Sequence, residues 1–250
     1  MLQVIVMTSD QQKHMLPGFF YLWEKYYPAR VVGVVIGMEK PESLPEGWRF
    51  VSQGNQVDYP QSRWSERLKR VCDEIADDVF MLLLEDYYLL RQADPVGIRM
   101  LYDYMYQFHN VLKCDLATDR LYSDGGGKYL WGLNTYDTCG YLDLIKSDYN
   151  TDYHFSLWGG LWRRDLLKKL LIPGESAQEI EMEGTKRLRA YQDEILVLGT
   201  RQAPLKHVNA IQGKKWNFNE STGIIALKEV DKKGLRALGY DWEKSKDEIE

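Results

Sequence analysis

The chain has 250 residues, of which 44% are hydrophobic and 28% charged, and this balance excludes an intrinsically disordered protein. Its formal net charge of -5 argues against a protein that binds nucleic acid mainly through a basic surface. The three cysteines, Cys72, Cys114 and Cys139, form no CxxC pair, so we expect free thiols in a reducing, cytoplasmic compartment. The apolar run at residues 2–7 is too short for a signal peptide or a membrane span, and we expect no transmembrane segment.

The N-terminal part alternates between strand and helix patterns. Two β-branched runs, at residues 4–7 and 31–36, predict strands buried on both faces, as in a parallel sheet covered by helices. The aromatic stripe at residues 19–27 predicts a helix that Pro28 ends. A short third strand is expected at residues 49–51, after a turn region rich in Pro and Gly.

The pattern continues toward the middle of the chain. Residues 64–75 carry apolar side chains at helical spacing, with Ser62 as the predicted N-cap. The most apolar strand is predicted at residues 79–84, and a helix is predicted from about residue 95 to about residue 112, with Pro95 in its first turn. This alternation predicts an α/β fold, an open and mostly parallel sheet flanked by helices, in which ligands bind at the carboxyl ends of the strands.

The second half is less regular. Residues 116–155 are rich in Tyr, Gly and Asp, which indicates short strands and binding loops. A short helix is predicted at residues 166–171 and a longer one from about residue 179 to about residue 198. The glycine run at residues 125–128 lacks the spacing of a phosphate loop and indicates a mobile loop. The sequence contains no GxGxxG, GxSxG or HExxH motif, which argues against a nicotinamide dehydrogenase, an α/β-hydrolase and a zinc protease.

Glu85 and Asp86 follow the most apolar predicted strand directly. Two adjacent carboxylates at such a place are costly unless a positive group faces them. A divalent ion that also binds a diphosphate is one such group, and it would neutralise the charge that develops when a sugar-phosphate bond breaks. The alternative is that both side chains cap the following turn or pair with an arginine.

Five segments of the chain form a series of motifs. They are residues 64–68 (WSERL), 82–87 (LLLEDY), 161–167 (LWRRDLL), 173–181 (PGESAQEIE) and 207–211 (HVNAI). In the same order, these segments resemble a family of bacterial and phage glycosyltransferase-like proteins of the GT-A fold. The resemblance extends from about residue 1 to about residue 216, and it implies a GT-A-like glycosyltransferase that takes a nucleotide-diphospho-sugar as donor and depends on Mn²⁺ or Mg²⁺.

The resemblance also implies an organisation into parts. We expect a single domain over residues 1–250, with a Rossmann-like, nucleotide-sugar-binding half at about 1–115 and an acceptor-binding, catalytic half at about 116–220. Residues 221–250 would form a charged C-terminal segment.

The donor side of the site follows from the same resemblance. Asp86, with Glu85 beside it, takes the place of the Asp-x-Asp metal motif, although the third position here is Tyr87. A late histidine is a further metal ligand in many such enzymes, which implies His207 or else a merely packed side chain. The end of the first strand would lie near the base or ribose, or form only a polar turn. The residues concerned are Thr8, Ser9 and Asp10.

Two arginines near the start of the predicted helix at 64–75 are further candidates for the donor site. Arg63 and Arg67 flank Trp64, where a cation could reach the diphosphate or pair with Asp86. The alternative for Arg67 is a solvated surface position.

The acceptor side requires a base if the sugar is transferred with inversion, because the attacking hydroxyl must lose a proton. The segment at residues 175–183 is dense in carboxylates, and its match to a Trp-Glu-Phe-Glu-like motif makes Glu179 or Glu181 the candidate base, with Gln178 in place of the usual aromatic residue. The alternative is that these acids complement a helix dipole. Trp158 and Trp162 flank a glycine pair and offer stacking faces to a sugar, or pack in the core.

The acceptor itself stays open in the sequence. A surface glycan or lipid-linked saccharide is one choice, and a hydroxymethylated base in phage DNA is another. A sugar nucleotidyltransferase is an alternative, but such enzymes usually carry a Gly-rich, basic loop after the first strand, and residues 8–12 provide none. A non-catalytic protein that binds nucleotide sugars is the alternative from a different class.

Overall fold

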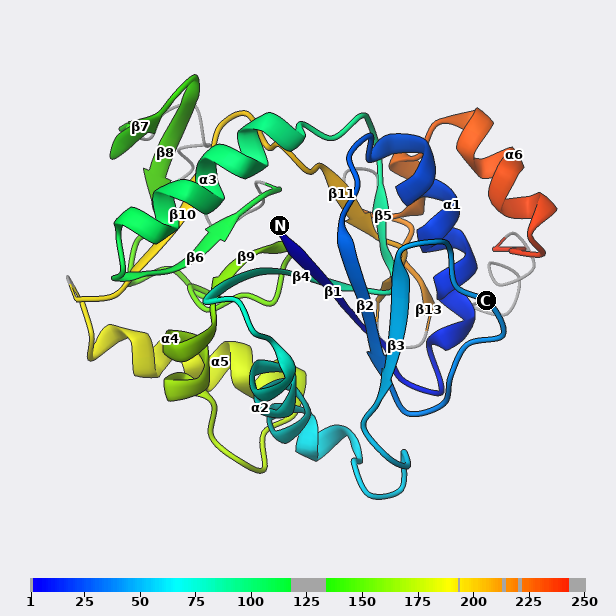
Figure 1. The fold of residues 1–250 in the computed structure, drawn as a ribbon, viewed down its shortest axis with the longest axis horizontal. Helices are drawn as coiled ribbons and strands as arrows, with labels where there is room; N and C mark the ends of the chain where they lie inside the picture. The colour runs from blue at the N-terminus through cyan, green and yellow to red at the C-terminus, as the bar shows by residue number, and fades with distance from the viewer. Residues whose placement is uncertain (1, 118–133, 193, 213–214, 220–221, 243–250) are drawn as a thin grey trace.

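A computed structural model describes residues 2–117, 134–192, 194–212, 215–219 and 222–242, so the predicted loop at 125–128 lies outside the described residues. Within them, the centre of the molecule is a nine-stranded sheet with the order β3-β2-β1-β4-β9-β6-β10-β8-β7 (Figure 1). Its strands are β1 (Gln3–Met7), β2 (Val32–Gly37), β3 (Trp48–Ser52), β4 (Val79–Leu84), β6 (Val111–Asp115), β7 (Asp137–Cys139), β8 (Leu142–Lys146), β9 (Gly160–Arg163) and β10 (Leu196–Thr200).

The directions of the strands confirm the predicted fold class. Strands β3, β2, β1 and β4 are parallel to one another, and β10 is parallel to β6. Strand β9 is antiparallel to both β4 and β6, so β6 points the same way as β4. Strand β8 is antiparallel to β10, and β7 is antiparallel to β8. Because β9 lies between β4 and β6, the first and second halves of the chain share one sheet.

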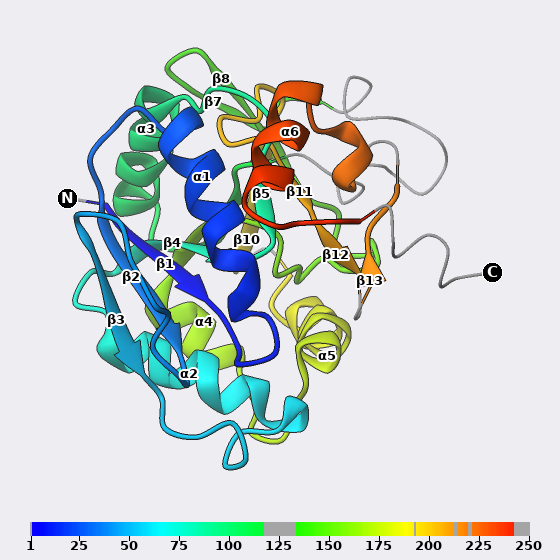
Figure 2. The ribbon, with the colours of Figure 1, turned by 90° about the vertical axis from the view of Figure 1, so that its right-hand side faces the viewer.

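Helices cover both faces of this sheet (Figure 1). One face packs against α1 (Leu16–Tyr26) and α3 (Pro95–Gln107), and the other against α2 (Trp64–Glu74), α4 (Arg164–Leu170) and α5 (Ala177–Arg189). Helix α6 (Glu229–Ala237) lies beside α1 (Figure 2). Its Asp231 forms an ion pair with Lys25 of α1 at 2.5 Å.

Strand β4 is apolar at every position because it packs against a hydrophobic core on each face of the sheet. Successive side chains of a strand point to opposite faces. Val79, Met81 and Leu83 accordingly belong to the core under α1 and α3. Phe80 and Leu82 belong to the core under α2, α4 and α5. Since both faces are buried, the strand has no solvent side on which a polar residue would be favoured.

Three predicted boundaries are wrong. The helix predicted to reach residue 112 ends at Gln107, because residues 111–115 form strand β6. The helix predicted to reach residue 198 ends at Arg189, because residues 196–200 form strand β10. In both places the apolar residues fit either period, and pairing within the sheet decides between them. Ser62 is not the N-cap of α2; it lies in a 3-10 turn, and Arg63 occupies the cap position without a side-chain hydrogen bond.

Candidate active site

The carboxyl ends of β1 and β4 open on a cavity of about 820 Å³. The two strands pair in parallel with Met7 opposite Leu84, so Thr8 and Glu85 leave the sheet side by side. This is the edge at which open α/β sheets bind ligands. The residues predicted for the site that line this cavity are Thr8, Ser9, Arg67, Glu85, Asp86 and Glu181.

Glu85 and Asp86 form the acidic end of the cavity. Only 7% of Glu85 is exposed, and burial is the main reason why the pKa values of both carboxyl groups are raised. The charge of Asp86 raises the pKa of Glu85 further. The backbone N–H of Ile211 donates to Asp86 Oδ2 at 3.3 Å and acts in the opposite direction on the pKa of Asp86. The pair is therefore a place where bound positive charge would be stabilising.

Arg67 supplies fixed positive charge at the same end. Its side chain is 3% exposed, donates to the carbonyl of Thr8 and donates from Nε to Gln53 Oε1 at 3.0 Å. Burial lowers the pKa of Arg67, and the charges of Glu85 and Asp10 oppose this change. The guanidinium is thus held rigidly beneath the cavity, where an anionic group of a ligand can meet it.

Arg63 and Asp10, also predicted for the site, have other partners. Arg63 Nε donates to Glu66 at 3.0 Å on the exposed side of α2. Asp10 Oδ1 accepts a hydrogen bond from the backbone N–H of Glu39 at 3.0 Å. Neither residue is among those that line the cavity, so we leave both out of the proposed site.

Two short strands close the cavity beside Asp86. Strand β5 (Tyr87–Leu89) pairs antiparallel with β11 (His207–Asn209), with Tyr87 opposite Asn209, and the N–H of Ala210 donates to the carbonyl of Asp86 at 2.8 Å. The pairing brings Asn209 into the lining of the cavity, where its Oδ1 is buried and has no hydrogen-bond partner among the described residues. Asn209 was not predicted from the sequence. The available signal was its position two residues after His207, on the same face of a strand.

His207 is placed behind the cavity and is not in its lining. The ring is 3% exposed, stacks on Tyr87 at 4.4 Å between centroids, and packs on Trp158 at 4.5 Å. Burial and then the nearby Lys113 ammonium lower the pKa of His207 to about 3. Among the described residues, no three His, Cys, Asp or Glu side chains gather closely enough to hold a metal ion. The prediction that His207 joins Asp86 on a metal therefore does not fit this placement.

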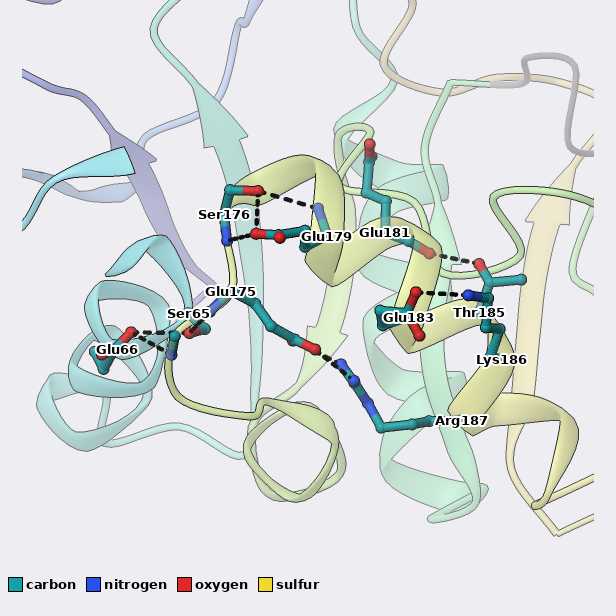
Figure 3. Close-up of polar contacts among 11 residues, drawn as sticks. Ser65, Glu66, Glu175, Ser176, Glu179, Glu181, Glu183, Thr185, Lys186 and Arg187 are labelled. Carbon is teal, nitrogen blue, oxygen red and sulfur yellow. Dashed lines mark hydrogen bonds and ion pairs between the residues drawn. The ribbon is translucent and has the colours of Figure 1, made fainter. Parts of the chain in front are cut away.

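Figure 3 shows the polar contacts of the four glutamates at and near the start of α5. Glu175 forms a bidentate ion pair with Arg187 at 2.6 and 2.8 Å. Glu179 completes a capping box with Ser176, and its exposed carboxylate bonds both the N–H and the hydroxyl of that residue. Glu183 pairs with Lys186 at 2.6 Å. Glu181 is the one of the four that lines the cavity.

The carboxylate of Glu181 is oriented by the backbone of the facing loop. Its Oε1 accepts a hydrogen bond from the N–H of Leu157 at 2.7 Å. The carbonyl of Leu157 in turn accepts a hydrogen bond from the hydroxyl of Tyr87 at 3.1 Å. Leu157 therefore links α5 to the strand that follows Asp86, and Glu181 is held in the lining of the same cavity.

The two tryptophans have different surroundings. Trp162 is completely buried in the core under α2, α4 and α5, where it packs against Phe155, and the Lys113 ammonium lies over its ring. It has no face to offer to a sugar, and the predicted role in acceptor binding does not fit it. Trp158 is half-buried and packs on Tyr87 and His207, so it supports the wall of the cavity from behind.

Comparisons with known proteins concern the fold. No protein-family model and no curated protein matches the chain. Among solved structures, S. aureus TarS matches with a TM-score of 0.47 and 13% identity over 79% of this chain and 35% of TarS. An active-site mutant of LgtC matches with a TM-score of 0.41 and 15% identity over 78% of this chain and 66% of LgtC. CMP:2-keto-3-deoxy-manno-octonic acid synthetase in complex with CTP matches with a TM-score of 0.40 and 14% identity, over 80% of this chain and 89% of the synthetase.

TarS has also been solved in complex with UDP. The chain spans about a third of the length of TarS. No helix in the described part of the chain is long and apolar enough to cross a membrane.

Proposed function

We propose that the chain is a glycosyltransferase that moves a sugar from a nucleotide-diphospho-sugar to an acceptor hydroxyl. The observation that carries this proposal is a single cavity lined by the buried Arg67, the buried Glu85, the half-buried Asp86, and Glu181 of α5. A cation site together with a fixed guanidinium suits a diphosphate, and a further carboxylate in the same cavity suits the activation of a hydroxyl.

The donor would bind along the ends of β1 and β4. Thr8 and Ser9 would face the nucleoside, and Arg67 would bind a phosphate oxygen. Asp86, with Glu85 beside it, would hold Mg²⁺ or Mn²⁺, since both ions prefer carboxylate oxygens. A cation bound there would supply Lewis-acid neutralisation of the departing nucleoside diphosphate.

Glu181 would accept the proton of the attacking hydroxyl. The hydrogen bond from the Leu157 N–H fixes the orientation of its carboxylate, so little reorganisation is needed when the acceptor arrives. The acceptor would enter between Glu181 and Gln178, which also lines the cavity. A saccharide fits this opening on chemical grounds, because its several hydroxyls can pair with such polar side chains.

The test uses two neighbouring glutamates of one helix. In the presence of Mn²⁺ and a nucleotide sugar, Glu181→Gln should lower the rate of sugar transfer roughly 100- to 10,000-fold, the usual contribution of a general base. Glu183→Gln is the matched control, because Glu183 lies on the same helix but pairs with Lys186 outside the cavity. It should keep the rate of the wild type.

The products separate the alternatives. A glycosyltransferase releases a nucleoside diphosphate, and Asp86→Ala should abolish that release. Release of pyrophosphate from a nucleoside triphosphate and a sugar phosphate would identify a nucleotidyltransferase instead. A rise in melting temperature with a nucleotide sugar but no turnover would identify a binding protein. Either result contradicts the proposal.

A further inference from the structure

We propose that Asn209 Oδ1, and not His207, is the side-chain ligand that joins Asp86 on the divalent cation. This inference rests on the proposed function and adds a residue to the same site. It gives a role to Asn209 Oδ1, a buried oxygen for which no hydrogen-bond donor is found among the described residues.

The first observation is position. Asn209 ends β11, opposite Tyr87, the residue that follows Asp86. The two next backbone N–H groups both bind Asp86: that of Ala210 donates to its carbonyl at 2.8 Å and that of Ile211 to its Oδ2 at 3.3 Å. Asn209 and Asp86 are thus held together by the backbone, and both side chains line the cavity.

The second observation is the state of the amide oxygen. Asn209 Oδ1 is buried and accepts no hydrogen bond from any residue that the structure describes, although the backbone N–H of the same residue is satisfied by the Thr222 carbonyl at 2.9 Å. A buried acceptor without a partner destabilises a fold, and such atoms are rare unless something absent from the bare chain binds them. An amide oxygen is a hard donor of the kind that Mg²⁺ and Mn²⁺ take together with carboxylates.

The third observation argues against His207 as a ligand of the cation. Its ring lies flat against Tyr87, with an interplanar angle of 12°, and Nε2 faces Gly159, where an added Cβ would be only 2.6 Å away. The charged group that lowers the pKa of the ring is the Lys113 ammonium, which is itself paired with the buried Asp115 carboxylate. The ring is buried between Tyr87 and Trp158, and His207 is not among the residues that line the cavity.

The test measures binding of Mn²⁺ alone to the full chain, through loss of the free Mn²⁺ signal in electron paramagnetic resonance. Asn209→Ala should weaken the binding about tenfold or more, the scale on which changes around a metal alter its affinity. Asn209→Asp should bind Mn²⁺ at least as tightly as the wild type, because it keeps an oxygen and adds charge. Gln212→Ala, which changes another residue of the cavity lining, is the matched control and should bind as the wild type does.

His207→Phe separates the two assignments, since it keeps an aromatic ring against Tyr87 and removes both nitrogens. It should keep the affinity of the wild type, and a thermal melt of each variant confirms that it is folded. Wild-type affinity in Asn209→Ala, or loss of binding in a folded His207→Phe, overturns the inference while the proposed function stands. Absence of Mn²⁺ binding in the wild type overturns the cation site of the proposed function as well.

Discussion

Arg67 and Glu85 bring opposite charges to one buried end of the cavity, and each charge stabilises the charged form of the other group. Burial and then the charge of Asp86 raise the pKa of Glu85, while the guanidinium of Arg67 lowers it. When both carboxyl groups are ionised, they carry one more negative charge than the single arginine can balance. A ligand that brings a cation therefore fits this end of the cavity better than an anion alone.

Arg67→Met tests how much the guanidinium of Arg67 contributes to the stability of the fold. The substitution leaves the Thr8 carbonyl and Gln53 Oε1 without their donors in a buried place. We expect the free energy of unfolding to fall by about 1–3 kcal/mol, the usual cost of a buried unsatisfied acceptor, as measured by urea denaturation. Arg63→Met is the control, since its ion pair with Glu66 is exposed and should contribute about 0.5 kcal/mol or less. Equal losses in both variants would show that the buried bonds add nothing.

The rule that ligands bind at strand ends identifies Thr8, Ser9, Glu85 and Asp86 from the amino-acid sequence alone, because it depends only on where apolar strands stop. The rule does not predict which side chains are buried in the core and which line the cavity. Trp162 is core because β9 inserts between β4 and β6, an antiparallel pairing that no local pattern reveals. Asn209 depends on the pairing of β11 with β5, which joins residues far apart in the sequence.

At the scale of elements, α5 begins with the strongest local signal in the chain. The hydroxyl of Ser176 accepts a hydrogen bond from the N–H of Glu179, and the carboxylate of Glu179 bonds back to Ser176. Such a box satisfies two N–H groups that a helix otherwise leaves open at its start. The cap fixes where α5 begins and hence where Glu181 meets the cavity.

Ser176→Ala should therefore destabilise the fold by about 1 kcal/mol, the usual value of a capping side chain. The control is Ser62→Ala, because Ser62 lies near the start of α2 but makes no cap in the structure. Chemical denaturation of both variants measures the difference. A loss of stability in Ser62→Ala as large as that in Ser176→Ala would contradict this account of the two helix starts.

The ends of helices α3 and α5 could not be predicted from the local sequence pattern. After α3 and after α5 the chain continues with apolar residues, and nothing in the period of the pattern distinguishes a longer helix from a turn followed by a strand. Strands β6 and β10 exist because they pair with each other and with β9 and β8. Strands β1 and β2 were predictable, since they are short runs rich in β-branched residues. Strand β4 was predictable because it is a short, continuous apolar run between polar residues.

At the scale of the whole molecule, the sheet is one cooperative unit built from both halves of the chain. Strand β9 lies between β4 and β6, and β10 pairs with β6, so neither half can complete its core alone. Burial of a titratable group anywhere in this unit should then appear in the unfolding of the whole chain. His154 is such a group: it is completely buried, and Ser147 Oγ lies 2.8 Å from its Nδ1.

Burial lowers the pKa of His154 from 6.5 to about 4, only partly opposed by Asp148. A group with a lowered pKa in the folded state binds fewer protons there than in the unfolded state, so unfolding becomes easier as pH falls. The stabilisation is complete above the unfolded value of 6.5 and is lost as pH falls through 4, by about 3 kcal/mol at most. His154→Gln should remove this part of the pH dependence between pH 6.5 and 4, while His14→Gln, at an exposed residue, should keep it. Urea denaturation at several pH values measures the slopes, and parallel slopes for wild type and His154→Gln would show that burial of this ring does not set the acid limit of the fold.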